Sequence, residues 1–178
     1  MCLISFLVMF SQANAASINQ VKEVEEQYKD WVVVDGTGGT PRYNAITTSS
    51  GGEELLAFSC HVNDACYLTM LIKASCDLGE GYPLLINADS GAAMAQGICI
   101  DNLQDEGFAE YRIEDPGAVF AETVYSDTRI GIAIPMASGK FRAVRFSLIG
   151  SQEAMARAVE LSQAKIYHKE DSIDSGDF

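Results

Sequence analysis

Apolar and polar residues alternate along most of this chain, and the alternation is clearest over residues 53–74. Folded as a β-hairpin about Asn63, this stretch places its large apolar side chains on one face, because successive residues of a strand point to opposite sides. A register shift of one residue would exchange the two faces. The pattern therefore predicts three core-facing cross-strand pairs: Leu56 with Met70, Phe58 with Leu68, and Cys60 with Cys66.

Other segments with period-two alternation predict further strands of an antiparallel sheet. These segments are 31–35, 42–49, 108–113, 129–135 and 141–149. Between the first two, the glycine-rich residues 36–41 lack the Lys-Ser/Thr ending of a P-loop and lead into a strand. A turn is therefore favoured there over a phosphate-binding loop.

A second hairpin is predicted from residues 82–88 and 92–101, joined across Ser90 and Gly91. The expected pairing sets large side chains against small ones on the core face. Its predicted pairs are Tyr82 with Cys99, Leu84 with Gly97, and Ile86 with Ala95.

Three segments favour helices over strands. Over residues 16–30, apolar side chains recur at three- and four-residue spacing, which predicts a short N-terminal helix. Residues 118–125 favour a short helix over an edge strand. Ser151 can N-cap a helix that runs to Tyr167, with Glu153 near its positive end. The buried side of this last helix is expected at Met155, Val159, Ser162 and Ile166.

Together these elements predict a mainly β protein, an antiparallel β-sandwich or open barrel of about eight or nine strands with a short N-terminal helix and a C-terminal helix. The expected organisation is a signal peptide over 1–15, a helical lead-in over 16–30 and a single β-rich domain over 31–167. A disordered acidic tail is expected over 168–178.

The N-terminal segment indicates export. An apolar run over 3–10 precedes Ala13 and Ala15, which are spaced as in an A-x-A cleavage site, although no Lys or Arg comes before the run. A buried N-terminal strand is the alternative. The run is far shorter than the roughly 20 residues of a membrane-spanning helix, and no later segment is long and apolar enough. The sequence therefore predicts a periplasmic or secreted protein without a transmembrane segment.

Cysteine usage agrees with an oxidising compartment. Cleavage after Ala15 would remove Cys2 and leave an even number of cysteines, for which three pairings exist. The central hairpin favours Cys60–Cys66, which leaves Cys76–Cys99. A zinc site is disfavoured because C-x2-C pairs are absent and the two histidines, His61 and His168, lie far apart in the sequence.

The formal net charge of −13 at pH 7 bears on partners. Such a chain is repelled by nucleic-acid phosphates and anionic lipids, so neither is expected as the main ligand. A basic protein outside the cytoplasm would instead be attracted. No cofactor motif is present, and the sequence does not indicate an oligomeric state.

No catalytic motif is complete. Asp89-Ser90-Gly91 with upstream His61 resembles part of a protease triad, but the intervening chain is too short for that fold, and a turn is favoured. Ser162-x-x-Lys165 lacks the partner motifs of its enzyme class. Acidic residues could supply a glycosidase pair, and four neighbouring oxygen-bearing residues could hold calcium, although a solvated charged surface is favoured over both. The carboxylates are Asp101, Asp105, Glu106, Glu110, Glu114 and Asp115, and the calcium set is Asp101, Asn102, Asp105 and Glu106.

The order of parts resembles a known family. An export signal, a strand that begins with Trp, disulfide-linked hairpins and the closing motif F-S-L-I-G-S-x-E-A-M at 146–155 are similar to the small secreted β-sandwich proteins of the invasion-associated locus B type. Periplasmic accessory proteins of type VI secretion share much of that plan. The resemblance covers most of residues 29–163 and implies an extracytoplasmic domain without catalytic residues. It rests on Trp31, Cys60, Cys99, Phe146, Gly150 and Ala154.

The sequence thus predicts an exported, non-enzymatic binding or accessory protein of the bacterial envelope, such as an inhibitor or a host-interaction factor. The alternative is an extracytoplasmic hydrolase with a carboxylate pair.

Overall fold

The computed structural model describes residues 21–36, 42–61, 66–103, 107–114, 128–136 and 139–171. All strands in this part form one ten-stranded antiparallel sheet in the order β1-β2-β3-β4-β5-β8-β7-β6-β9-β10. The prediction of a mainly β protein is confirmed. Strand pairing runs through all ten described strands, so they are not divided between two separate sheets as in a sandwich. The elements are β1 (Val21–Tyr28), β2 (Trp31–Gly36), β3 (Arg42–Thr48), β4 (Leu55–His61), β5 (Cys66–Ile72), β6 (Gly81–Ala88), β7 (Gly91–Leu103), β8 (Phe108–Glu114), β9 (Arg129–Pro135), β10 (Phe141–Ser147) and α2 (Ser151–Asp171).

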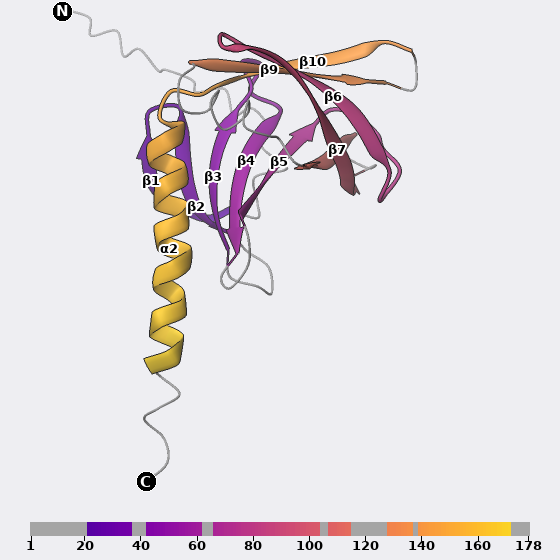
Figure 1. Cartoon of the computed structure of the whole chain (residues 1–178). Helices are drawn as coiled ribbons and strands as arrows, with labels where there is room; N and C mark the ends of the chain where they lie inside the picture. The colour runs from indigo at the N-terminus through magenta and orange to yellow at the C-terminus, as the bar shows by residue number, and fades with distance from the viewer. Residues whose placement is uncertain are drawn as a thin grey trace, which may run out of the picture.

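The sheet bends so strongly that its last strands meet its first ones. Strands β9 and β10 cross above the ends of β3 and β4 instead of continuing beside them (Figure 1). An isolated bridge joins Ser49 to Phe146, and the Ser50 N–H donates to the Arg145 carbonyl at 3.1 Å. The same apolar face of both halves of the sheet therefore encloses one core.

The central hairpin confirms the predicted register. Leu56 faces Met70, Phe58 faces Leu68, and Cys60 faces Cys66. Leu56, Met70 and Cys60 are buried, as the pattern requires. The core also takes side chains from both halves of the sheet, including Trp31, Ile86, Ile132 and Phe146.

Helix α2 lies against the first four strands (Figure 1). Ala154 and Ala158 are fully buried, because their small side chains allow the helix to approach the sheet closely. The predicted buried side is confirmed at Ser162, whereas Met155 and Val159 are only partly buried and the buried line runs through the two alanines. The side chain of Ile166 lies outside the described part of the helix. The helix continues past Tyr167 to Asp171, so the boundary predicted for the tail was wrong.

The predicted N-terminal helix is wrong over the described residues, because 21–28 form strand β1. This strand pairs with β2 across a tight turn in which Lys29 has a φ of 53°. Register shifts interrupt the ladder between Val21 and Val24 and between Val24 and Glu26. Because each shift breaks the period of two, the apolar positions imitate helical spacing.

The register predicted for the second hairpin was also wrong, by two residues. Strands β6 and β7 pair Tyr82 with Gly97 and Ala88 with Gly91, so that Asp89 and Ser90 alone form the turn. A shift of two residues keeps every side chain on its own face, so alternation could not detect it. Turn length decides this register.

Three predictions fall outside the described residues, namely the signal peptide over 1–15, the helix over 118–125 and the tail over 172–178. Within the described part of the chain, no helix is both long enough and apolar enough to cross a membrane.

Candidate functional site

The structure brings the four predicted cysteines together in the predicted pairs. Cys60 and Cys66 are directly opposite across β4 and β5, with Cα atoms 4.2 Å apart. Cys76 and Cys99 are bonded with Cα atoms 6.0 Å apart. Both predicted pairs lie at the distance of a disulfide bond.

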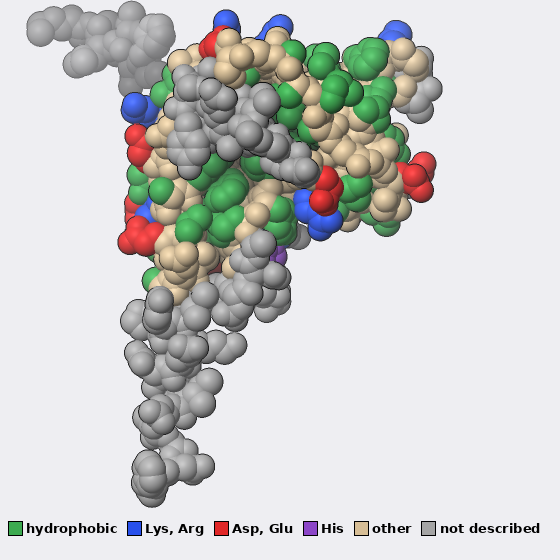
Figure 2. Space-filling model, viewed as in Figure 1, with side chains coloured by type: hydrophobic (Ala, Val, Ile, Leu, Met, Phe, Trp, Pro, Cys, Tyr) green, Lys and Arg blue, Asp and Glu red, His purple; other side chains and the backbone are tan. Residues whose placement is uncertain are grey.

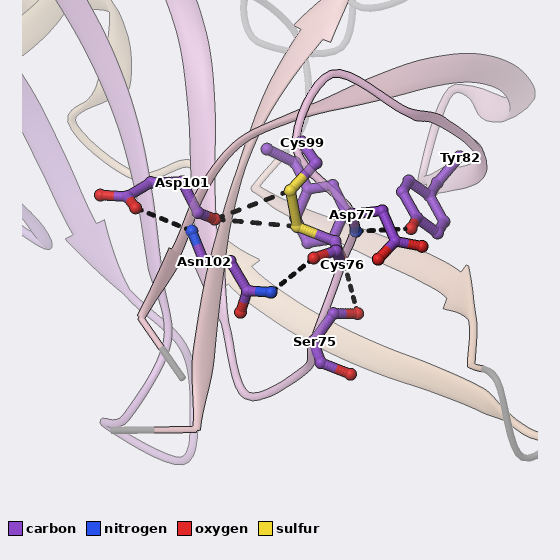
Figure 3. Close-up of a disulfide and its surroundings, with 8 residues drawn as sticks. Ser75, Cys76, Asp77, Tyr82, Cys99, Asp101 and Asn102 are labelled. Atoms are coloured by element: carbon purple, nitrogen blue, oxygen red, sulfur yellow. Dashed lines mark hydrogen bonds between the residues drawn. A yellow bond between two sulfur atoms is a disulfide. The ribbon is translucent and has the colours of Figure 1, made fainter. Parts of the chain in front are cut away.

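The Cys76–Cys99 disulfide is a buried structural link (Figure 3). The Asn102 side-chain amide donates to the carbonyl oxygen of Cys76, and the Asp77 N–H donates to the Tyr82 hydroxyl at 3.0 Å. These bonds fix the segment between β5 and β6 against β7. With both sulfurs enclosed, the pair stabilises the fold and offers no accessible thiol chemistry.

His61 lies at the end of β4, beside the Cys60–Cys66 disulfide. Its ring stacks on Tyr67 at a centroid distance of 5.4 Å, and its Nε2 lies 2.7 Å from the tyrosine hydroxyl oxygen. Among the described residues, no three His, Cys, Asp or Glu side chains are grouped as they would be around a metal ion.

Two of the predicted carboxylates become neighbours. Asp101 on β7 pairs directly with Glu110 on β8. Burial raises the pKa of Glu110 and the charge of Asp101 adds to this, whereas a hydrogen bond with Thr69 and the charge of Arg42 act in the opposite direction. Glu110 therefore holds its proton to a higher pH than an ordinary glutamate.

The remaining acidic candidates do not form a site in the described part of the chain. Glu114 accepts a hydrogen bond from Arg112 Nε at 2.6 Å on an exposed surface. Asn102, a member of the calcium set, donates its side-chain amide to Cys76. Asp105, Glu106 and Asp115 lie outside the described residues.

The serines of the two enzyme-like motifs lie in a turn and in a helix. Asp89 and Ser90 form the turn between β6 and β7, as predicted. Ser162 is buried in α2, where its hydroxyl donates to the Val159 carbonyl at 2.7 Å.

A hollow of about 310 Å³ lies on the outer face of β6, β9 and β10. Its floor is Gly131, which pairs with Asn87 on β6 and with Arg145 on β10. Because glycine has no side chain, the outer surface of the sheet is indented at this position. Arg129 lines the rim and pairs with Asp89 at 3.6 Å.

An exposed apolar strip lies beside this hollow. Ala143, Ala133, Leu85 and Met94 form one cross-strand row over β10, β9, β6 and β7. Leu85 is 46% exposed, Met94 68%, and nearby Phe141 72%. In the space-filling view, hydrophobic side chains gather over β6, β9 and β10 (Figure 2). These five residues are called the outer strip below.

Basic residues are concentrated next to the outer strip. The segment 128–152 carries four basic and no acidic side chains, in a chain with 12 basic and 25 acidic residues. Arg142 turns inward to pair with buried Glu54, whereas Arg145 and Lys140 are exposed. The outer strip thus has a positive margin on an acidic molecule.

Sequence reasoning missed this surface, although one signal was present. Leu85, Ala133 and Ala143 occupy outward positions in strands whose inward positions are also apolar. Both faces of such strands are apolar, so the sequence does not distinguish their exposed positions from their core positions. Only the adjacency of β6 and β9, which are far apart in the sequence, joins these positions into one row.

No protein-family model, no curated protein and no solved structure matches this chain.

Proposed function

We propose that this chain is an exported, non-enzymatic binding protein of the bacterial envelope, which engages another protein through the outer strip. The observation that carries this proposal is the row from Ala143 to Met94, which crosses four strands and leaves Leu85 and Met94 exposed. A contiguous exposed apolar surface bordered by polar groups is typical of interaction sites. The resemblance to the invasion-associated locus B type supports the same role.

Export into the periplasm or beyond is part of the proposal. It is supported by the two disulfides, since such bonds persist in oxidising compartments. The N-terminal apolar run with Ala13 and Ala15 supports it from the sequence.

Site-specific photocrosslinking in intact cells tests the binding role. A benzophenone amino acid is placed at Met94 within the outer strip, and a matched control carries it at Leu78, which is 67% exposed but lies in the turn before β6. We expect a discrete adduct from Met94 that is lost when Leu85→Asp is added, and none from Leu78. Equal adducts from Met94 and Leu78, or no adduct from Met94, would exclude the outer strip as the binding surface.

The hydrolase alternative is favoured by one observation, the direct pairing of Asp101 with Glu110. The raised pKa of Glu110 is the property required of a general acid, and Asp101 is the exposed carboxylate beside it. Hydrolysis of aryl glycosides by the purified chain, abolished by Glu110→Gln and by Asp101→Asn, would establish it. Absence of turnover across a panel of glycosides leaves the binding role.

A further inference from the structure

We propose that the occupant of the outer strip is a segment of a partner protein that is apolar and carries a carboxylate, and that Arg145 binds this carboxylate at the hollow over Gly131. The inference rests on the binding function proposed above and names the chemistry of the partner. It reverses the expectation from net charge, which favours a basic partner.

Arg145 is the basic residue of the hollow that can bind a ligand. Among the described residues its guanidinium has no hydrogen-bond or ion-pair partner, although its backbone carbonyl accepts a bond from Ser50. The Cγ atom of Arg145 lies 3.9 Å from the point where a Cβ on Gly131 would stand, so its alkyl chain runs along the hollow. Asn87 lies across the hollow and offers a side-chain amide. The hollow is thus lined by one residue with a guanidinium and one with a side-chain amide, which are both donors to a carboxylate. The charge of Asp89, which also lines the hollow, is offset by Arg129.

The other cations around the hollow are already used or are peripheral. Arg129 pairs with Asp89, and Arg142 pairs with Glu54 inside the fold. Lys140 stands at the end of the β9–β10 hairpin, next to exposed Phe141. The local positive charge available to a ligand is therefore centred on Arg145, with Lys140 at the far margin.

The size of the outer strip suits an extended peptide. Four neighbouring strands span about 14 Å, which equals the length of about four residues of an extended chain. Arg145 is two residues from Ala143 on the same strand face, so a carboxylate within one or two positions of the apolar residues would reach it. An anionic membrane fits less well, because the net charge of −13 repels it as the molecule approaches.

A displayed random heptapeptide library, selected against the immobilised full chain, tests this proposal. We expect selected peptides to be enriched in Asp or Glu flanked by apolar residues. The best peptide should bind about tenfold more tightly than its Asp→Asn counterpart, as measured by fluorescence anisotropy, and more weakly as salt is added.

Three variants give the controls. Arg145→Gln should remove the preference for the acidic peptide over its neutral counterpart, and Gly131→Val should block binding by filling the hollow while keeping every charge. Arg112→Gln removes the same charge from an exposed arginine on β8 and should bind like the parent. Selection of basic peptides, or an acidic preference that survives Arg145→Gln, would overturn the inference.

Two further measurements separate the other occupants. In flotation assays, a higher affinity for phosphatidylglycerol vesicles than for the peptide would assign the surface to a membrane. In sedimentation, dimers of the parent chain that are lost with Arg145→Gln would assign it to a second copy. Either result overturns the inference. A crosslink at Met94 without an acidic preference removes only this inference, whereas loss of the crosslink removes the proposed function itself.

Discussion

The indole N–H of Trp31 donates a hydrogen bond of 3.0 Å to the carbonyl oxygen of Ser147, across 116 residues of sequence. Trp31 begins β2 and is fully buried, while Ser147 ends β10. Beside this bond the Ser147 hydroxyl donates to Asp30 at 2.6 Å. These contacts hold the two ends of the sheet together.

The first prediction concerns this link. Trp31→Phe removes the donor, leaves the Ser147 carbonyl without its partner and opens space in the core. We expect the free energy of unfolding to fall by about 2–4 kcal/mol in urea titrations. Met94→Ala, at an exposed position, is the control and should change it by less than about 0.5 kcal/mol. Equal midpoints for the two variants would show that the indole does not hold the sheet ends.

The second prediction concerns a carboxylate at the turn between β3 and β4. Glu54 is 4% exposed, accepts a hydrogen bond of 2.6 Å from the Ser49 hydroxyl and pairs with Arg142 on β10. Arg142→Met should cost about 1–3 kcal/mol, because it leaves the buried carboxylate without its cation. Adding Glu54→Gln should recover part of this loss. A double variant as unstable as the sum of the single ones would contradict direct coupling.

The third prediction follows from the pKa of Glu54. Burial raises this pKa, but hydrogen bonds from Ser49 and Arg142 outweigh burial, so the pKa lies below its ordinary value of 4.5. The folded state then binds fewer protons than the unfolded state, so this stability is present above pH 4.5 and is lost as pH falls through the folded pKa. Chemical denaturation at several pH values should show this acid loss, and Glu54→Gln should reduce it.

The fourth prediction has the opposite sign. The pKa of Glu110 is raised, mainly by burial, so the folded state binds more protons than the unfolded state as pH rises above 4.5. Stability should therefore decrease as pH rises through the folded pKa of this group. Glu110→Gln should stabilise the protein at neutral pH and have no such effect well below pH 4. Destabilisation by Glu110→Gln at neutral pH would mean that its charged form is favoured by the fold.

The fifth prediction compares the disulfides. Cys60–Cys66 closes a loop of sequence separation 6 and Cys76–Cys99 one of 23. Chain entropy assigns about 2.4 and about 3.5 kcal/mol to them. Replacing Cys76 and Cys99 with Ser should therefore lower the melting temperature more than replacing Cys60 and Cys66. Under reducing conditions the parent and both variants should converge, and a persistent difference would point to packing of the sulfurs instead.

The central hairpin shows what could be predicted. Alternation excludes any shift of its register by one residue, and the pairing of Cys60 with Cys66 selects the observed register among those that remain. The disulfides then follow from that hairpin, since one pair fixes the other. In contrast, the register of β6 and β7 depends on a two-residue turn that alternation does not detect.

The candidate surface could not be predicted in the same way. Leu85 and Ala133 become neighbours only because β6 pairs with β9, although β7 and β8 lie between these two strands in the sequence. Likewise, Arg145 is one of several basic residues in the sequence, and its lack of a partner among the described residues depends on where its neighbours point.

The sequence by itself determined that this is a β-rich chain with a closing helix and two disulfides, because side-chain period and cysteine spacing are local properties. Tertiary structure alone decided that β1 is a strand, that the sheet bends until Trp31 meets Ser147, and that an apolar row borders a glycine-floored hollow. The physical reason is that hydrogen-bond partners distant along the chain override local preference and select which outward side chains become neighbours.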